Sequence, residues 1–105
     1  MAIKRGVSLY SYQNETFLGE MTLDDCIRVC AEMGANGIEV IGEQSFWGHP
    51  EQSIEDAAIE GWHASIKKHG AVPVALDFMI DYKRYKGRIM TLEEQVESIK
   101  KDIAL

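Results

Sequence analysis

Three helix-start signals of one form divide this sequence. In each signal a Ser or Thr is followed three residues later by an acidic residue, at 22–25 (TLDD), 53–56 (SIED) and 91–94 (TLEE). Such a pair satisfies the free amides in the first turn of a helix. Apolar residues three and four positions apart follow each signal, so the sequence predicts three amphipathic helices, each with one buried face. Gly34 and Gly70 are expected to end the first two helices.

Short runs rich in Val, Ile, Leu and Tyr alternate with these helices, at residues 6–12, 37–41 and 72–78. Runs of this length and composition are typical of strands, so the predicted order is βαβαβα. Strands joined by crossover helices pair in parallel with right-handed connections. Two α/β architectures fit this order: a small open doubly wound parallel sheet, and the first three βα units of a (β/α)8 TIM barrel.

Polar residues inside the predicted strands favour the barrel. A strand buried on both faces of an open sheet should be almost wholly apolar. Alternation along the strands instead gives one mixed face, with these polar residues: Ser8, Tyr10, Tyr12, Glu39 and Asp77. The interior of a barrel carries polar groups toward its catalytic rim, which explains a mixed face better than a dry open sheet does. We therefore expect the helices to lie on one side of the sheet.

The length of the chain agrees with this interpretation. A typical barrel of roughly 250 residues needs about 94 for three βα units, close to the 105 residues here. The last helical pattern reaches Leu105 without a Gly or Pro to stop it. The sequence thus predicts that residues 1–105 are the N-terminal βαβαβα portion of a TIM barrel, truncated inside the third helix.

The charge balance excludes several classes of partner. Seventeen acidic and 11 basic residues give a net charge of −6, which argues against binding to nucleic acid or to an anionic membrane. No apolar run is long enough to span a membrane, and the first residues do not form a signal peptide, so we expect a cytoplasmic protein. Cys26 and Cys30 lie one helical turn apart and are expected to be reduced core residues rather than metal ligands.

Particular segments carry a resemblance to a known family. Residues 4–12 (KRGVSLYSY), the helix at 22–33 and residues 34–41 (GANGIEVI) resemble the start of the sugar phosphate isomerase/epimerase family, the xylose isomerase-like TIM barrels. The layout of all 105 residues agrees with that family. Within it, VSLYSYQ at 7–13 followed by EVIGEQ at 39–44 is most similar to the catalytic larger subunit of bacterial C-glycoside deglycosidases.

The resemblance implies a metal-dependent carbohydrate enzyme. Family members bind a divalent metal, usually Mn²⁺, through Glu, Asp and His residues in the second half of the barrel, so the implied metal ligands lie outside this segment and none lies within it. A C-glycoside deglycosidase would break the sugar–aryl C–C bond of a 3-oxo-C-glycoside by proton abstraction and elimination. The alternative is a sugar or sugar phosphate isomerase/epimerase. This segment alone is expected to be inactive.

The resemblance also implies partners for the segment: the remainder of the barrel, a carbohydrate or C-glycoside substrate, and a small β-rich partner subunit. A hypothesis of another class remains open. A non-enzymatic small α/β interaction module would be complete at this length and would use its aromatic loop for protein contacts.

Candidate substrate-binding residues lie at the carboxyl ends of the predicted strands, where barrel enzymes carry their chemistry. Tyr10 and Tyr12 either pack against a sugar ring or an aromatic aglycone, or simply fill the barrel interior. Glu43 and Asp77 can accept hydrogen bonds from sugar hydroxyls; the alternatives are a solvated carboxylate for Glu43 and a loop cap for Asp77. Glu39 is expected to pair with a basic residue of another strand rather than to orient substrate.

The loop after the second strand, residues 44–50 (QSFWGHP), contains two large aromatic residues and a histidine. Trp47 is a candidate for sugar stacking, with packing against another part of the protein as the alternative for this loop. Histidine is a common general acid or base at neutral pH, so His49 is the one candidate for acid–base catalysis, although a lone loop His is more often a surface residue. Residues 82–88 (YKRYKGR) form either an anion contact or, more commonly for such a run, a solvated charged loop.

Overall fold

The computed structural model describes residues 3–46, 48–49 and 53–105. The elements, in chain order, are β1 (Gly6–Ser8), a 3₁₀ turn η1 (Leu9–Tyr12), α1 (Gln13–Phe17), α2 (Leu23–Glu32), β2 (Gly37–Ile41), α3 (Gly42–Ser45), α4 (Asp56–His69), β3 (Val72–Asp77) and α5 (Leu92–Ile103). The predicted alternation of strands and long helices is confirmed. The short helices α1 and α3 and the turn η1 are additions that hydrophobic periodicity, which needs longer windows, does not predict.

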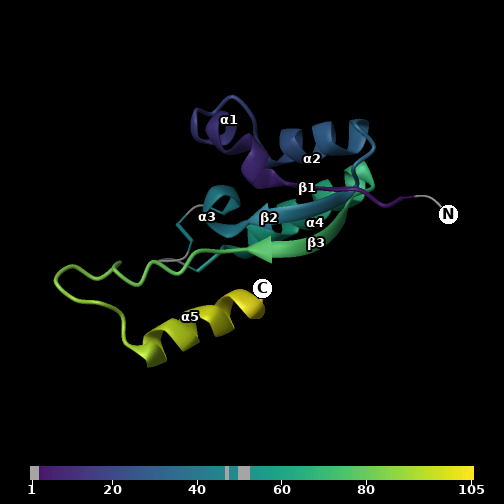
Figure 1. Ribbon diagram of the computed structural model, residues 1–105. Helices are drawn as coiled ribbons and strands as arrows, with labels where there is room; N and C mark the ends of the chain where they lie inside the picture. The colour runs from purple at the N-terminus through teal and green to yellow at the C-terminus, as the bar shows by residue number, and fades with distance from the viewer. Residues whose placement is uncertain (1–2, 47, 50–52) are drawn as a thin grey trace.

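The three strands form a small open sheet in the order β1-β2-β3 (Figure 1). Both pairings are parallel, as predicted, with Gly6 opposite Gly37 and Ile41 opposite Asp77. The β2–β3 register shifts between Ile38 and Glu39, which leaves one extra residue on β3. The described residues are therefore an α/β unit with crossover helices.

Two of the three predicted helix starts are confirmed in atomic detail. Thr22 Oγ1 accepts from the Asp25 amide at 3.1 Å, and Asp25 Oδ2 accepts from the Thr22 amide at 2.9 Å. Thr91 and Glu94 form the same reciprocal pair at the start of α5. The start predicted at Ser53 is wrong: α4 begins at Asp56, because Glu55 keeps an extended backbone as the N-cap and makes no side-chain capping bond. Gly34 and Gly70 follow the ends of α2 and α4, as predicted, and both have a positive φ.

The first strand is shorter than predicted. Pairing stops at Ser8, and the chain turns into η1, because the Ser8 hydroxyl accepts a hydrogen bond from the Tyr10 amide at 3.3 Å. Tyr10 and Tyr12 therefore lie in η1, beyond the end of β1. The prediction that they lie on the inner face of the first strand is wrong. The second strand has the predicted bounds, and the third ends one residue early, at Asp77.

The core lies between the sheet and the two helices α2 and α4. Its buried side chains come from η1, α2, β2, the segment after α3, and α4, and they are Leu9, Cys26, Ile27, Cys30, Ile38, Val40, Phe46 and Trp62. Because Ile38 and Val40 join both helices in one cluster, α2 and α4 cover the same face of the sheet, as expected. Both cysteines are free and buried, as predicted, and burial raises the pKa of each thiol.

Helix α5 departs from the prediction of a buried apolar face. Leu92 and Ile103 are each 76% exposed and Val96 is 40% exposed, while Asp102 on the same helix is buried. The helix lies to one side of β3 rather than against the sheet beside α4 (Figure 1). Its apolar face is exposed because no other element in the described part of the chain packs along it. No helix among the described residues is long and apolar enough to cross a membrane.

A polar clamp joins α2 to α4. Asp24 Oδ1 accepts from the Ser65 hydroxyl at 2.5 Å and lies 3.0 Å from His69 Nε2, while Asp24 Oδ2 accepts from Lys68 Nζ at 3.2 Å. The Ser65 hydrogen bond, helped by Lys68 and His69, lowers the pKa of Asp24 to about 2. The folded state therefore favours the charged carboxylate.

This clamp predicts a loss of stability in acid. A carboxyl group whose pKa is lower in the folded than in the unfolded state stabilises the protein above its unfolded pKa, and the contribution disappears as the pH falls through the folded pKa. We expect Asp24→Asn to lower the free energy of unfolding by about 1 kcal/mol at pH 7, since Asp24 is partly exposed and screened. The difference between the variant and the parent should shrink between about pH 4 and pH 2.

Urea unfolding at several pH values measures both effects, and Glu20→Gln, an exposed loop substitution, is the control. A difference for Asp24→Asn that persists unchanged to pH 2 would show that the charge of Asp24 does not stabilise the clamp.

Candidate functional site at the carboxyl ends of the strands

The end of β2 turns directly into α3, which carries Glu43. Glu43 Oε1 accepts a hydrogen bond from the Met79 amide at 2.6 Å, in the segment that follows β3. One carboxylate oxygen thus links the carboxyl ends of β2 and β3. The contact also holds Glu43 in a fixed position, half-buried rather than free in solvent.

Gln44 makes a second link from α3. Its Nε2 donates to the Leu9 carbonyl at 2.8 Å, so α3 fastens η1 and hence the carboxyl end of β1. The hydrogen bonds of Glu43 and Gln44 therefore link the carboxyl ends of all three strands to α3. The sequence singles out neither Gln44 nor α3, because both partners are distant along the chain.

His49 and Asp102 form a buried pair at this end of the sheet. His49 Nε2 lies 2.8 Å from Asp102 Oδ1, and the two side chains are only 6% and 3% exposed. The prediction of acid–base catalysis by His49 requires that its ring lie open in the loop. In this arrangement its Nε2 faces Asp102 and its ring is enclosed.

Gly42 makes room for this pair. A Cβ atom at position 42 would lie 2.9 Å from Cδ2 and 3.1 Å from Nε2 of His49, closer than such atoms normally approach. Only glycine leaves space for the imidazole against the start of α3. The glycine at the first position of α3 is thus explained by the nearby side chain of His49.

Other charged groups surround Asp102. Burial raises the pKa of Asp102, because a charged carboxylate loses its hydration there. His49 opposes that change, Glu43 adds to it by charge repulsion, and Arg84 opposes it more weakly. Arg84 Nε and Nη2 are buried and have no hydrogen-bond partner among the described residues. The same holds for His49 Nε2, so its 2.8 Å approach to Asp102 Oδ1 is a close polar contact without hydrogen-bond geometry. We call His49, Asp102, Glu43 and Arg84 the buried cluster.

The two candidate tyrosines have different surroundings. Tyr10 is 59% exposed on η1, so its ring is open to a ligand or a further protein segment. Tyr12 packs against the core, and burial, with smaller contributions from Cys30 and Cys26, raises its pKa. The alternative in which a tyrosine fills space agrees with the position of Tyr12, and a binding role for Tyr10 stays a prediction.

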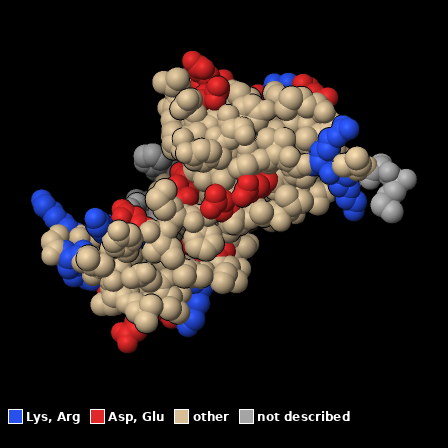
Figure 2. All heavy atoms as spheres, in the orientation of Figure 1, with Lys and Arg blue, Asp and Glu red and all other residues tan. Residues whose placement is uncertain are grey.

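The remaining candidates lie on or near the strands. Asp77 is exposed at the end of β3, opposite Ile41, and Glu39 is half-buried on β2. Figure 2 shows acidic atoms in a band across the middle of the molecule, where Figure 1 places the sheet. Phe46 is buried in the core, in agreement with the packing alternative for its loop, whereas Trp47 lies outside the described residues.

The basic loop at 82–88 is partly neutralised within the chain. Arg88 donates to both carboxylate oxygens of Glu94, at 2.6 and 2.9 Å, and lies 4.2 Å from the centre of the Tyr85 ring. Lys83 lies over the ring of Tyr82. For Arg88 and Lys83 these contacts agree with a solvated charged loop, whereas Arg84 of the same loop has buried nitrogens without a hydrogen-bond partner among the described residues.

The described residues do not provide a metal site. No group of three or more His, Cys, Asp or Glu side chains within them could hold a metal ion. In the buried cluster, Glu43 Oε1 already accepts from the Met79 amide, and His49 Nε2 lies 2.8 Å from Asp102 Oδ1. A divalent metal bound by residues outside this chain, as the resemblance implies, stays a prediction.

Two curated proteins are similar to this chain, and both are named "C-glycoside deglycosidase alpha subunit", from Arthrobacter globiformis. One is 32% identical over 100 residues, which cover 94% of this chain and 27% of that protein. The other is 29% identical over 96 residues, which cover 90% of this chain and 27% of that protein. The chain thus spans about a quarter of the length of these relatives, and the relationship is distant. No family model matches the chain.

Proposed function

We propose that this chain forms the first three βα units of a TIM-barrel enzyme that cleaves C-glycosides. The observation that carries the proposal is the 32% identity, over 94% of this chain, to a protein named as the alpha subunit of a C-glycoside deglycosidase. That similarity favours an enzyme subunit over a self-contained interaction module. The rest of the barrel would correspond to the remaining length of those relatives.

The fold supports the barrel part of the proposal. The strands are parallel and neighbour one another in chain order, and α2 and α4 cover one face. Glu39 and Asp77 belong to the mixed face predicted from alternation, which would line the interior of a closed barrel. The carboxyl ends of the strands, fastened by Glu43 and Gln44, would form part of the catalytic rim.

The proposed reaction acts on a 3-oxo-C-glycoside. The ketone at C3 acidifies the C2 proton, and a base removes it to form an enolate. The enolate electrons then form the C1–C2 double bond as the C1–aryl bond breaks, and the aryl carbon takes up a proton. Asp77 would accept hydrogen bonds from sugar hydroxyls, and the exposed ring of Tyr10 would pack against the sugar or the aglycone.

The base is not assigned to a residue of this chain. His49 is enclosed and faces Asp102, which leaves it no path to a substrate in this arrangement. Its role here is to hold the buried cluster together.

A divalent metal, Mn²⁺ in our proposal, would polarise the substrate carbonyl when bound by residues outside this chain. A small β-rich subunit would complete the protein, in keeping with the name "alpha subunit" of the relatives.

Asp77→Asn in the complete protein tests the substrate-binding role. We expect kcat/KM for release of the aglycone from a 3-oxo-C-glycoside to fall about tenfold, as for loss of one charged hydrogen bond. Glu60→Gln, on the exposed side of α4, removes a charge away from the strand ends and should leave the rate unchanged. Circular dichroism of both variants checks that they fold.

Free and phosphorylated sugars are included as substrates in the same assay. Isomerisation or epimerisation of these sugars, without cleavage of the C-glycoside, would favour the isomerase alternative and overturn the proposed reaction. Equal rates for Asp77→Asn and the parent protein would remove Asp77 from the site while leaving the reaction class standing.

A further inference from the structure

The connection between β3 and α5, residues 78–91, contains no helix or strand and is mostly exposed. Connections from a strand to a helix in α/β proteins usually have about two to six residues, and much longer ones are commonly functional. Figure 1 shows this segment running past the carboxyl ends of the strands before it turns back to α5. We call residues 78–91 the β3–α5 loop. Its length needs an explanation other than the joining of two elements.

Hydrogen bonds fix the shape of this loop. The Met90 amide donates to the Tyr82 carbonyl at 2.7 Å and closes the loop on itself. Met90 is 4% exposed, and Gln95 on α5 donates to its carbonyl at 3.1 Å. The two bonds from Arg88 to Glu94 add another connection to α5. A loop held in this way loses little conformational freedom on binding, which favours a tight contact with a partner.

Large apolar side chains are exposed on this ordered loop. Met79 is 70% exposed, Ile89 62% and Tyr82 48%. Tyrosine and methionine are enriched at protein interfaces relative to the rest of the protein surface. Covering these side chains would remove apolar area from water, which stabilises a complex. The loop therefore has the composition of an interface.

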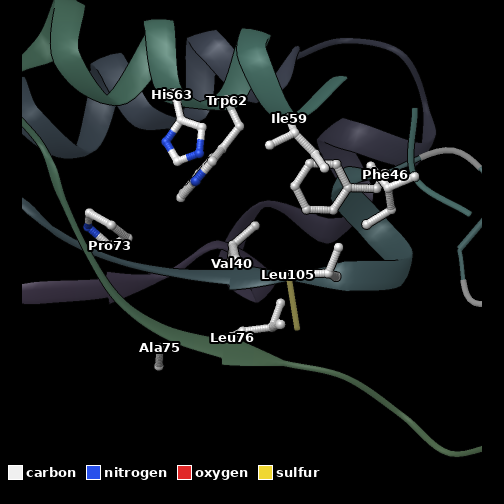
Figure 3. A pocket seen from close by; sticks show the side chains of 10 residues that line it. Val40, Phe46, Ile59, Trp62, His63, Pro73, Ala75, Leu76 and Leu105 are labelled. Atoms are coloured by element: carbon white, nitrogen blue, oxygen red, sulfur yellow. The ribbon is translucent and has the colours of Figure 1, made fainter. Parts of the chain in front are cut away.

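These exposed side chains line neither of two cavities in the described part of the chain. Figure 3 shows an apolar cavity of about 260 Å³, lined by residues of β2, α4 and β3 and by Leu105. A second cavity, of about 280 Å³, lies between Tyr85 and α5. Met79, Tyr82 and Ile89 are absent from both linings. Small ligands bind in concave sites, so a second protein matches these side chains better.

The charge of the loop indicates the chemistry of that protein. Four basic residues, Lys83, Arg84, Lys86 and Arg88, face only Asp81 in the same segment, whereas the whole chain has a net charge of −6. Lys83 and Lys86 are exposed. In a two-fold contact between copies of this chain the loop would meet itself, and these like charges would oppose each other. A different chain, with carboxylates around an apolar patch, matches the loop better.

We propose that the β3–α5 loop is the docking surface for a second, non-identical protein subunit with an acidic contact face. That the enzyme has such a subunit rests on the proposed function, since both relatives are named as an alpha subunit. The partner covers the exposed apolar side chains and sets carboxylates beside Lys83 and Lys86. The loop begins where the Met79 amide is bonded to Glu43, so the partner lies next to the proposed catalytic rim.

Charge reversal in the complete protein tests this surface. The complex is isolated from its natural source through a tag on this chain, native mass spectrometry identifies its subunits, and the released partner is titrated onto each variant. We expect Lys83→Glu/Lys86→Glu to raise the Kd at least tenfold, and by less at high salt, because exposed charges are screened. Lys4→Glu/Arg5→Glu makes the same change of charge at exposed positions before β1 and should leave the Kd unchanged.

Ile89→Ser tests the apolar part of the contact. We expect it to raise the Kd about fivefold at every ionic strength, because it removes apolar area rather than charge. Circular dichroism checks that all variants fold. Unchanged binding of the partner by Lys83→Glu/Lys86→Glu would refute the docking surface, and so would a parent protein that contains only copies of this chain.

Aglycone release from the 3-oxo-C-glycoside, measured in parallel, separates this surface from the proposed function. If the parent cleaves the substrate while the loop variants bind the partner as tightly as the parent does, the docking surface alone is wrong. If the loop variants lose the partner but the parent complex cleaves no C-glycoside, the docking surface is upheld and the proposed reaction is wrong.

Discussion

Replacing Ile38 with alanine is expected to lower the free energy of unfolding by about 3 kcal/mol. Ile38 is fully buried on β2, the central strand, and belongs to the cluster that joins the sheet to α2 and α4. Removing three carbon atoms there leaves a cavity that neither neighbouring strand can close without disturbing its own pairing. Urea unfolding followed by circular dichroism measures the change.

Ile89→Ala is the matched control, because it removes the same atoms from a side chain that is 62% exposed. It should change the free energy of unfolding by less than about 0.5 kcal/mol. If the two variants lose similar stability, the core of this chain does not lie where the structure puts it.

Replacing Gly42 with alanine is expected to destabilise the protein by about 1 to 3 kcal/mol. The added methyl group would meet the His49 ring at 2.9 Å, so either α3 or His49 must move. Movement of His49 would break its contact with Asp102 and leave a buried carboxylate without its closest partner. Thermal and urea unfolding measure the loss.

Gly61→Ala makes the same chemical change with the opposite expected sign. Gly61 lies inside α4, and a Cβ there would meet nothing within 4 Å. Alanine should therefore stabilise α4 by about 0.5 to 1 kcal/mol, because it lowers the backbone entropy of the unfolded chain. A Gly42→Ala variant as stable as the parent would mean that His49 does not pack against α3.

The elements that could be predicted from the sequence are those governed by short-range chemistry. Thr22 and Thr91 each precede an acid by three residues, and both capping interactions are complete within four residues. The parallel order of the strands follows from the long crossovers between them. In contrast, the end of β1 at Ser8 depends on a side chain that competes with the strand ladder, and strand propensity does not report that competition.

The candidate site was predictable in its location but not in its contacts. Glu43 and Asp77 lie at the carboxyl ends of β2 and β3, as the strand order requires. The bond from the Met79 amide to Glu43 and the burial of His49 against Asp102 join segments far apart in the sequence. Asp102 carries no local signal, since a charged residue near the end of an amphipathic helix is ordinarily solvated.

The parallel sheet also determines which outer strands of two copies of this chain could pair with each other. Among the described residues β1 and β3 are the outer strands, and in a parallel sheet their free edges are not equivalent. A second copy that continued the sheet in parallel would pair its β1 with the β3 of the first copy. The β1 edge of the first copy and the β3 edge of the second would then stay free. Such head-to-tail addition repeats without limit unless the twist of the strands closes it into a ring.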